Sequence, residues 1–120
     1  AGADLPCVKI GTKLADAILE ISQKRLGMTT VVDAKDPDQI IGICTDGDLR
    51  RAFAQEIILQ QSNVEDVMTK NFKTVYSDVL ATEAVMLMQQ HKISALPVLD
   101  RQNKLIGALN LHDVLKAGVV

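Results

Sequence analysis

The hydrophobic positions of the chain form two kinds of pattern. Apolar residues at i, i+3, i+4 and i+7 from Leu14 predict an amphipathic helix over residues 14–25, and a second helix is expected at Leu80–Gln90. Short apolar runs between polar turns predict strands at Cys7–Ile10, Met28–Val32, Ile40–Cys44, Phe72–Val75, Ala95–Leu99 and Leu105–Leu109. Two more helices are predicted at Asp46–Gln55 and Leu111–Ala117. Thr12, and Ser77 or Asp78, are expected to cap the first two helices.

These elements occur twice in the same order. The segment LGMTTVVD (26–33) aligns with ISALPVLD (93–100) at an offset of 67, and IGICT (41–45) aligns with IGALN (106–110) at an offset of 65. One β-α-β-β-α copy cannot cover both faces of its small sheet, whereas two stacked copies with pseudo-twofold symmetry can. We therefore predict an α+β fold built from two repeats, at residues 1–61 and 62–120.

The two copies differ at their beginnings. Residues 64–68 have the pattern of a short helix that leads into the second copy, and the first copy has no counterpart because only six residues precede Cys7. We expect that the chain was cut from a longer protein, just after the matching helix.

Composition and charge exclude several classes of function. The net charge is −2 and neither half is basic, which disfavours a nucleic-acid or anionic membrane surface. No apolar run is long enough to span a bilayer. Two cysteines, Cys7 and Cys44, fit a reduced, cytoplasmic setting rather than a disulfide scaffold. The spacing of histidines and cysteines predicts no metal site, and no catalytic constellation is found. With three aromatic residues, any bound base would have to contact aliphatic side chains.

One motif is repeated at the passage from a strand into a helix. It reads Gly42-x-x-Thr45-x-x-Asp48 in the first copy and Gly107-x-x-Asn110-x-x-Asp113 in the second. Thr or Asn followed by an acid three residues later resembles a capping box, which would be a purely structural role. The same corner could instead bind a nucleotide, with the carboxylate accepting from ribose hydroxyls and the helix N-terminus facing a phosphate. The glycines would allow close packing or close approach of a ligand.

The duplicated unit, with ALPVLD (95–100) and IGALNLHDVL (106–115), resembles a tandem pair of cystathionine-β-synthase (CBS) domains, a Bateman module. More narrowly, LGMTTVVD (26–33), IIGICTDGDLRR (40–51) and LHDVLKAGVV (111–120) resemble the C-terminal region of bacterial arabinose-5-phosphate isomerases. That resemblance implies a missing N-terminal sugar-isomerase domain, which makes arabinose 5-phosphate for synthesis of Kdo, an acidic sugar of lipopolysaccharide. It also implies nucleotide binding between the repeats and association into disk-like homodimers.

The family's binding pattern carries onto Thr45 and Asp48, and onto Asp113 in the second copy. Asn110 departs from the usual Thr or Ser, and Pro97 stands where the first copy has Thr30, so one site is as consistent with the pattern as two. CMP-Kdo, the activated end product, is a logical regulatory ligand. His112 could donate to its sugar carboxylate, and Arg50 or Arg51 could reach an anionic group.

Two other functions stay open at this point. The chain could be a structural oligomerisation module whose apparent site is only helix capping, or an adenylate sensor that binds AMP or ATP. No catalytic cofactor is expected in any of these cases.

Overall fold

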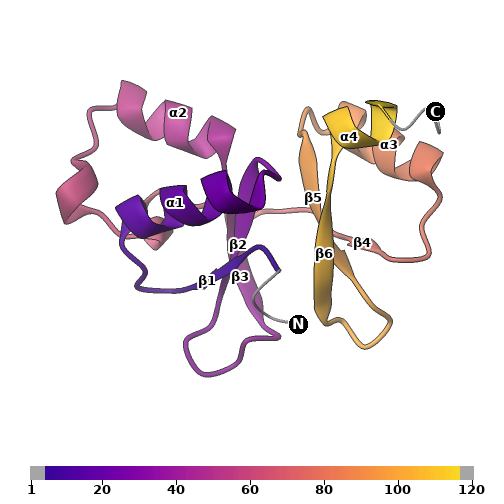
Figure 1. Cartoon of the computed structure of the whole chain (residues 1–120), viewed down its shortest axis with the longest axis horizontal. Helices are drawn as coiled ribbons and strands as arrows, with labels where there is room; N and C mark the ends of the chain where they lie inside the picture. The colour runs from indigo at the N-terminus through magenta and orange to yellow at the C-terminus, as the bar shows by residue number, and fades with distance from the viewer. Residues whose placement is uncertain (1–4, 117–120) are drawn as a thin grey trace. The chain divides into compact units, whose positions relative to one another are not determined.

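The computed structural model describes residues 5–116, which form two small sheets with flanking helices (Figure 1). The first group of elements is β1 (Cys7–Lys9), α1 (Leu14–Lys24), β2 (Met28–Val32), β3 (Ile40–Thr45), α2 (Asp46–Ala54) and two 3₁₀ helices (Leu59–Gln61, Val64–Asp66). The second group is β4 (Val75–Tyr76), α3 (Ala81–Gln90), β5 (Ala95–Leu99), β6 (Leu105–Asn110) and α4 (Leu111–Lys116). The predicted α+β class and the β-α-β-β-α order are confirmed. The predicted end of the last helix, Ala117, lies outside the described residues.

Each sheet has three strands and the same topology. In the first, β1 is parallel to β2 and β2 is antiparallel to β3; in the second, β4, β5 and β6 pair in the same way. The register shifts between Val31 and Val32 in β2, and between Val98 and Leu99 in β5. These two irregularities fall at equivalent positions of the aligned sequences, so the repeat extends to a local detail of the backbone.

The chain divides into two compact units, residues 1–72 and 73–120. This division lies later than the predicted boundary between repeats, which follows residue 61. The residues in between pack on the first unit: Val64 is fully buried there with Leu14, Ala17 and Ile21 of α1. The predicted short helix at 64–68 is a single 3₁₀ turn, Val64–Asp66, and it completes the core of the first unit.

The core of the second unit is smaller and also aliphatic. Its buried members come from β4, α3 and β5: Val75, Ala84, Met88 and Leu96. Partly buried aliphatic residues surround them, among them Val98 and Leu109 on the sheet. Helix α4 packs against α3 and β6. The strand predicted at Phe72–Val75 is displaced to Val75–Tyr76, where both residues pair with β5.

The predicted caps of α1 and α3 are wrong. The N-cap residues are Lys13 and Leu80, and neither side chain accepts a hydrogen bond from its helix. The Thr12 hydroxyl donates to the carbonyl of Lys9 at 2.6 Å, while the amide of Leu14 donates to the carbonyl of Ser62 at 2.9 Å. The first amide of α1 therefore donates to a backbone carbonyl that is distant in the sequence, and not to a capping side chain.

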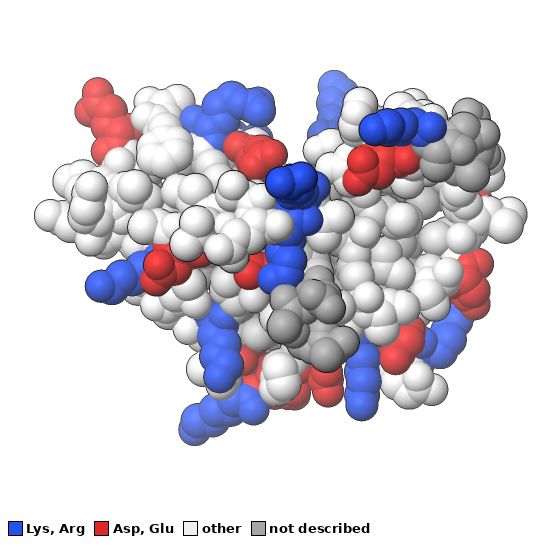
Figure 2. All heavy atoms as spheres, in the orientation of Figure 1, with Lys and Arg blue, Asp and Glu red and all other residues white. Residues whose placement is uncertain are grey.

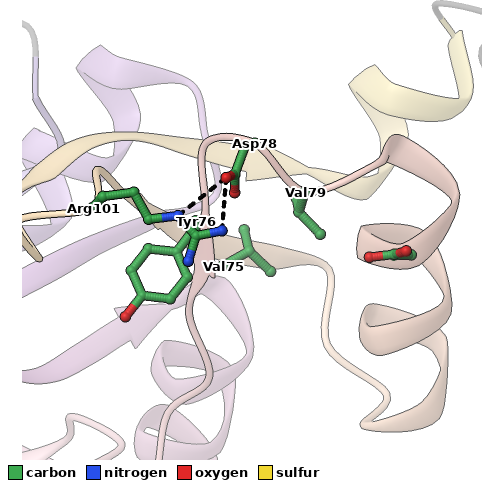
Figure 3. Close-up of a pocket in the computed structure, with 6 residues that line it drawn as sticks. Val75, Tyr76, Asp78, Val79 and Arg101 are labelled. Atoms are coloured by element: carbon green, nitrogen blue, oxygen red, sulfur yellow. Dashed lines mark hydrogen bonds and ion pairs between the residues drawn. The ribbon is translucent and has the colours of Figure 1, made fainter.

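In the second unit, Arg101 binds Asp78, one of the two residues that were expected to cap α3. The Arg101 guanidinium donates to Asp78 Oδ2 from Nε at 3.0 Å and from Nη2 at 2.6 Å (Figure 3). The same guanidinium lies 4.4 Å from the centre of the Tyr76 ring. These groups border a hollow of about 370 Å³ that is also lined by Val75, Val79 and Glu83. The pair is solvent-exposed, so its contribution to stability is small.

The charged side chains show no single-sign patch on the face seen in Figure 2, where acidic and basic residues alternate over each unit. Within residues 5–116, no helix has the length and apolar character needed to cross a membrane.

Candidate functional site

The first corner is built where β3 passes directly into α2. Thr45 has an extended conformation and acts as the N-cap of α2. Its hydroxyl accepts from the amide of Asp48 at 3.1 Å, and the Asp48 carboxylate accepts from the amide of Thr45 at 3.0 Å. This is a closed capping box, as the spacing of the two residues predicts, with Asp in place of the commoner Glu.

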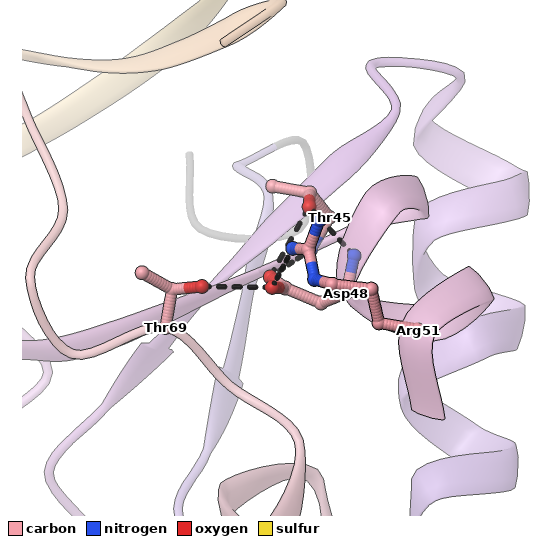
Figure 4. Close-up of polar contacts among 4 residues, drawn as sticks. All are labelled: Thr45, Asp48, Arg51 and Thr69. Atoms are coloured by element: carbon pink, nitrogen blue, oxygen red, sulfur yellow. Dashed lines mark hydrogen bonds and ion pairs between the residues drawn. The ribbon is translucent and has the colours of Figure 1, made fainter. Parts of the chain in front are cut away.

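The Asp48 carboxylate also has partners outside the box. Its Oδ1 atom accepts from Arg51 Nη2 at 2.6 Å and from the Thr69 hydroxyl at 2.7 Å, while Oδ2 also accepts from the Thr45 hydroxyl at 3.1 Å (Figure 4). Asp48 is only 5% exposed. A carboxylate offers about four acceptor positions, so its hydrogen-bonding capacity is essentially filled. Burial of this charge is tolerated because each oxygen is paired.

Thr69 reaches Asp48 from the segment that leads out of the first unit. Its amide donates to the carbonyl of Ile43 at 2.7 Å, and the amide of Ile43 donates to the Thr69 carbonyl at 2.9 Å. This two-bond bridge covers the free edge of β3. Thr69 is not among the residues predicted from the sequence, and no local signal indicates its role, because its partners are 21 and 26 positions away.

Gly42 is required by this close approach. A Cβ atom at Gly42 would lie 2.6 Å from Met68 Sδ and 3.1 Å from the Thr69 carbonyl oxygen. At the equivalent Gly107, a Cβ atom would meet no atom of residues 5–116 within 4 Å. Among the described residues, packing therefore explains the glycine at position 42 and does not explain the one at position 107.

The second corner differs from the first in the partners of its aspartate. Asn110 Oδ1 accepts from the amides of His112 at 2.9 Å and Asp113 at 3.3 Å, so Asn110 does cap α4. Asp113 is exposed, and no residue in the described range 5–116 donates a hydrogen bond to its carboxylate. The second half of the capping box, which Asp48 closes in the first unit, is thus not made by Asp113 with these residues.

The remaining candidates are dispersed. Thr30 is fully buried, and its hydroxyl donates to the carbonyl of Pro6 at 2.7 Å. Pro97 is fully buried in β5, opposite Ala108. Arg50 and His112 are exposed, and it is Arg51 rather than Arg50 that contacts Asp48. Within each unit, the structure brings Thr45 together with Asp48, and Asn110 together with the backbone of Asp113.

Cys44 lies directly before the first corner and is fully buried. Burial, reinforced by the negative charges of Asp48 and Asp46, raises the pKa of its thiol from 9.0 to about 12. The thiol therefore stays protonated at neutral pH and belongs to the core, as the sequence indicates. Both cysteines are free.

Comparison with known proteins gives one consistent family. The CBS domain model matches residues 3–55 and 64–120. Arabinose 5-phosphate isomerase KdsD of Pseudomonas aeruginosa is 46% identical over 119 residues, which are 99% of this chain and 36% of that protein. The chain thus spans about a third of the length of this curated relative.

Two solved structures illustrate the similarity of the fold. A protein with CBS domains from Burkholderia ambifaria has a TM-score of 0.84 at 33% identity, over 95% of this chain and 82% of that one. A CBS domain protein from Pyrobaculum aerophilum, solved in complex with AMP, has a TM-score of 0.79 at 17% identity, over 97% of this chain and 92% of that one. The duplicated β-α-β-β-α unit, its two corner motifs and these matches together show that this chain belongs to the CBS domain family.

Proposed function

We propose that this chain is a regulatory module that binds a nucleotide at the second corner. The observation that carries the proposal is the difference between the two aspartates. Capping accounts fully for Asp48, whose carboxylate is buried and saturated. It leaves Asp113 unexplained, because that carboxylate is exposed and accepts from none of the described residues. An exposed carboxylate in the first turn of a helix, to which none of the described residues donates, is suited to accept hydrogen bonds from a ligand.

The chemistry of the second corner fits a ribose. A vicinal diol presents two hydroxyl donors to one carboxylate, and hydrogen bonds to a charged acceptor are stronger than those between neutral groups. His112, exposed in the same turn, would supply a donor to an anionic group of the ligand. The AMP complex of the P. aerophilum relative supports the nucleotide class. Few aromatic rings are available, so the base would contact aliphatic side chains.

The similarity to KdsD supports a specific setting for this module. We propose that it belongs to a longer bacterial cytoplasmic protein with an N-terminal sugar-isomerase domain, which interconverts ribulose 5-phosphate and arabinose 5-phosphate. The regulatory ligand would be CMP-Kdo, the activated end product, and the module would act as a homodimer. The two free cysteines agree with a reducing compartment. For regulation, the ligand must bind one arrangement of the catalytic domain better than another.

Calorimetric titration with CMP-Kdo, CMP, AMP and ATP tests the ligand class. We expect binding of at least one of these nucleotides, and an increase of about tenfold or more in Kd for Asp113→Asn, which keeps the size of the side chain but removes its charge. Glu83→Gln is the matched control, because Glu83 is also an exposed acid in the first turn of a helix. Binding of AMP alone would refute CMP-Kdo as the ligand. Equal affinities for Asp113→Asn and the wild type would refute the second corner as the site.

A second function is favoured by exposed aliphatic residues in the second unit. Leu80, Met86 and Leu115 are 64%, 67% and 47% exposed, and they lie on or beside α3 and α4. They would serve a structural oligomerisation module. Binding of none of the four nucleotides, together with a dimer that Met86→Glu dissociates in analytical ultracentrifugation, would favour this function over the regulatory one.

A further inference from the structure

We propose that the hollow beside β4 in the second unit binds a free basic amino acid, with lysine as the best match. The hollow has a volume of about 370 Å³, at the lower end of the range of small-molecule pockets. It is lined by two carboxylates, a guanidinium, a phenol ring and two aliphatic side chains: Asp78, Glu83, Arg101, Tyr76, Val75 and Val79. None of these residues belongs to either corner, so binding here is independent of the proposed nucleotide site.

The Arg101 guanidinium is restrained by contacts on two sides. Its Nε and Nη2 atoms both donate to Asp78 Oδ2, at 3.0 and 2.6 Å, and the guanidinium lies 4.4 Å from the centre of the Tyr76 ring (Figure 3). The ring is itself held, because the Tyr76 hydroxyl donates to Asn103 Oδ1 at 2.9 Å. Among the residues that the structure describes, none accepts a hydrogen bond from Arg101 Nη1. This nitrogen of a planar, pre-oriented guanidinium is suited to bind a carboxylate.

The hollow also offers acceptors, on its two acidic side chains. Both hydrogen bonds from Arg101 end on Asp78 Oδ2, and within residues 5–116 no group donates to Asp78 Oδ1. Glu83, in the first turn of α3, is exposed, and its carboxylate likewise accepts from no described residue. Two carboxylates beside one guanidinium leave the hollow with an excess of negative charge. A ligand of net positive charge therefore complements it.

Lysine carries the matching set of groups. Its α-carboxylate would accept from Arg101 Nη1, and its neighbouring α-ammonium would donate to Oδ1 of Asp78, the residue that Arg101 already binds. Its methylene chain would lie on Val75, which is only 8% exposed, and on the half-buried Val79. Its ε-ammonium would donate to Glu83. A molecule with one charged end would leave either the guanidinium nitrogen or the carboxylates of the hollow without a partner from the ligand.

The experiment is calorimetric titration of the 120-residue chain with L-lysine at neutral pH. The charged groups are solvent-exposed, so binding should be weak but saturable, with a Kd of about 1 mM. L-Norleucine lacks the ε-ammonium and cadaverine lacks the α-carboxylate, so each should bind about fivefold more weakly than lysine. Arg101→Gln should raise the Kd for lysine by about fivefold. Lys104→Gln is the matched control, because it removes a positive charge from the same turn without altering the lining of the hollow.

Two further measurements locate the ligand. In Glu83→Gln, lysine should lose its advantage over norleucine, because the partner of the ε-ammonium is then neutral. Amide chemical shifts measured by NMR during the lysine titration should change most at Val75, Val79 and Arg101, and urea unfolding of each variant checks that its fold is intact.

Absence of saturable binding up to about 10 mM lysine would overturn the inference. Equal affinities of the wild type for lysine and norleucine, an unchanged Kd in Arg101→Gln, or shift changes that are largest outside the hollow would overturn it as well. None of these results bears on the proposed function, which the separate titrations with nucleotides test.

Discussion

The two motif glycines allow the same substitution to be made at matched positions with opposite expected outcomes. In Gly42→Ala, the new Cβ atom would be placed 2.6 Å from Met68 Sδ and 3.1 Å from the backbone oxygen of Thr69. The Met68 side chain can move, but the carbonyl is fixed by its bond from Ile43. Overpacking of a filled site costs about 1–3 kcal/mol. Ala has less conformational freedom than Gly in the unfolded chain, which offsets this loss of stability by roughly 0.5–1 kcal/mol. We expect a net loss of about 1–2 kcal/mol.

In Gly107→Ala the same entropic gain applies without a collision among the described residues, because no atom of residues 5–116 lies within 4 Å of the added atom. We therefore expect stabilisation by roughly 0.5–1 kcal/mol. Neither glycine has a positive φ angle, so backbone strain does not enter the comparison. The assay is urea unfolding at 25 °C followed by circular dichroism, with slopes compared to confirm that the transitions are equivalent. Free energies of the two variants that agree within about 0.5 kcal/mol would refute the argument from packing.

Two further predictions concern the first corner and its neighbour. Thr45→Ala should lower the free energy of unfolding by about 1–2 kcal/mol, because it removes the side chain of the capping box. Asn110→Ala should lower the free energy of unfolding by a smaller amount. Urea unfolding that ranks the two variants in the reverse order would contradict this prediction. The raised pKa of Cys44 predicts how stability depends on pH. Above pH 9 the thiol ionises in the unfolded chain, whereas in the folded chain, where its pKa is about 12, it keeps its proton. The free energy of unfolding should therefore fall as the pH rises. Between pH 8 and pH 10 the loss should be smaller in Cys44→Ala than in the wild type, and equal losses would show that the thiol does not contribute.

The sequence predicts the strands well where local pattern determines them. Met28–Val32 and Ala95–Leu99 were expected with their observed bounds, because each is an apolar run enclosed by polar turns. The closed box at Thr45 and Asp48 is also local, since its partners are three residues apart. The repeated pattern of apolar runs and polar turns therefore predicts most of the strands and helices and their order along the chain.

The sequence fails where a distant group competes with a local one. Thr12 was expected to cap α1, but the carbonyl of Ser62 takes the amide of Leu14. Asp78 was a possible cap of α3, but Arg101 holds its carboxylate. The role of Thr69 depends on a bridge to Ile43, and no periodicity or spacing records such a contact.

The buried position of Val64 determines where the first unit can be separated from the second without loss of core residues. The boundary of the aligned repeat and the boundary of the compact unit differ: the segment that introduces the second copy completes the core of the first unit. A polypeptide ending at residue 61 would lack the fully buried Val64 and the strand-edge cover at Thr69, whereas one ending after Phe72 would retain both. A cut at the repeat boundary would thus remove part of the core of the first unit, whereas a cut after Phe72 would leave that core whole.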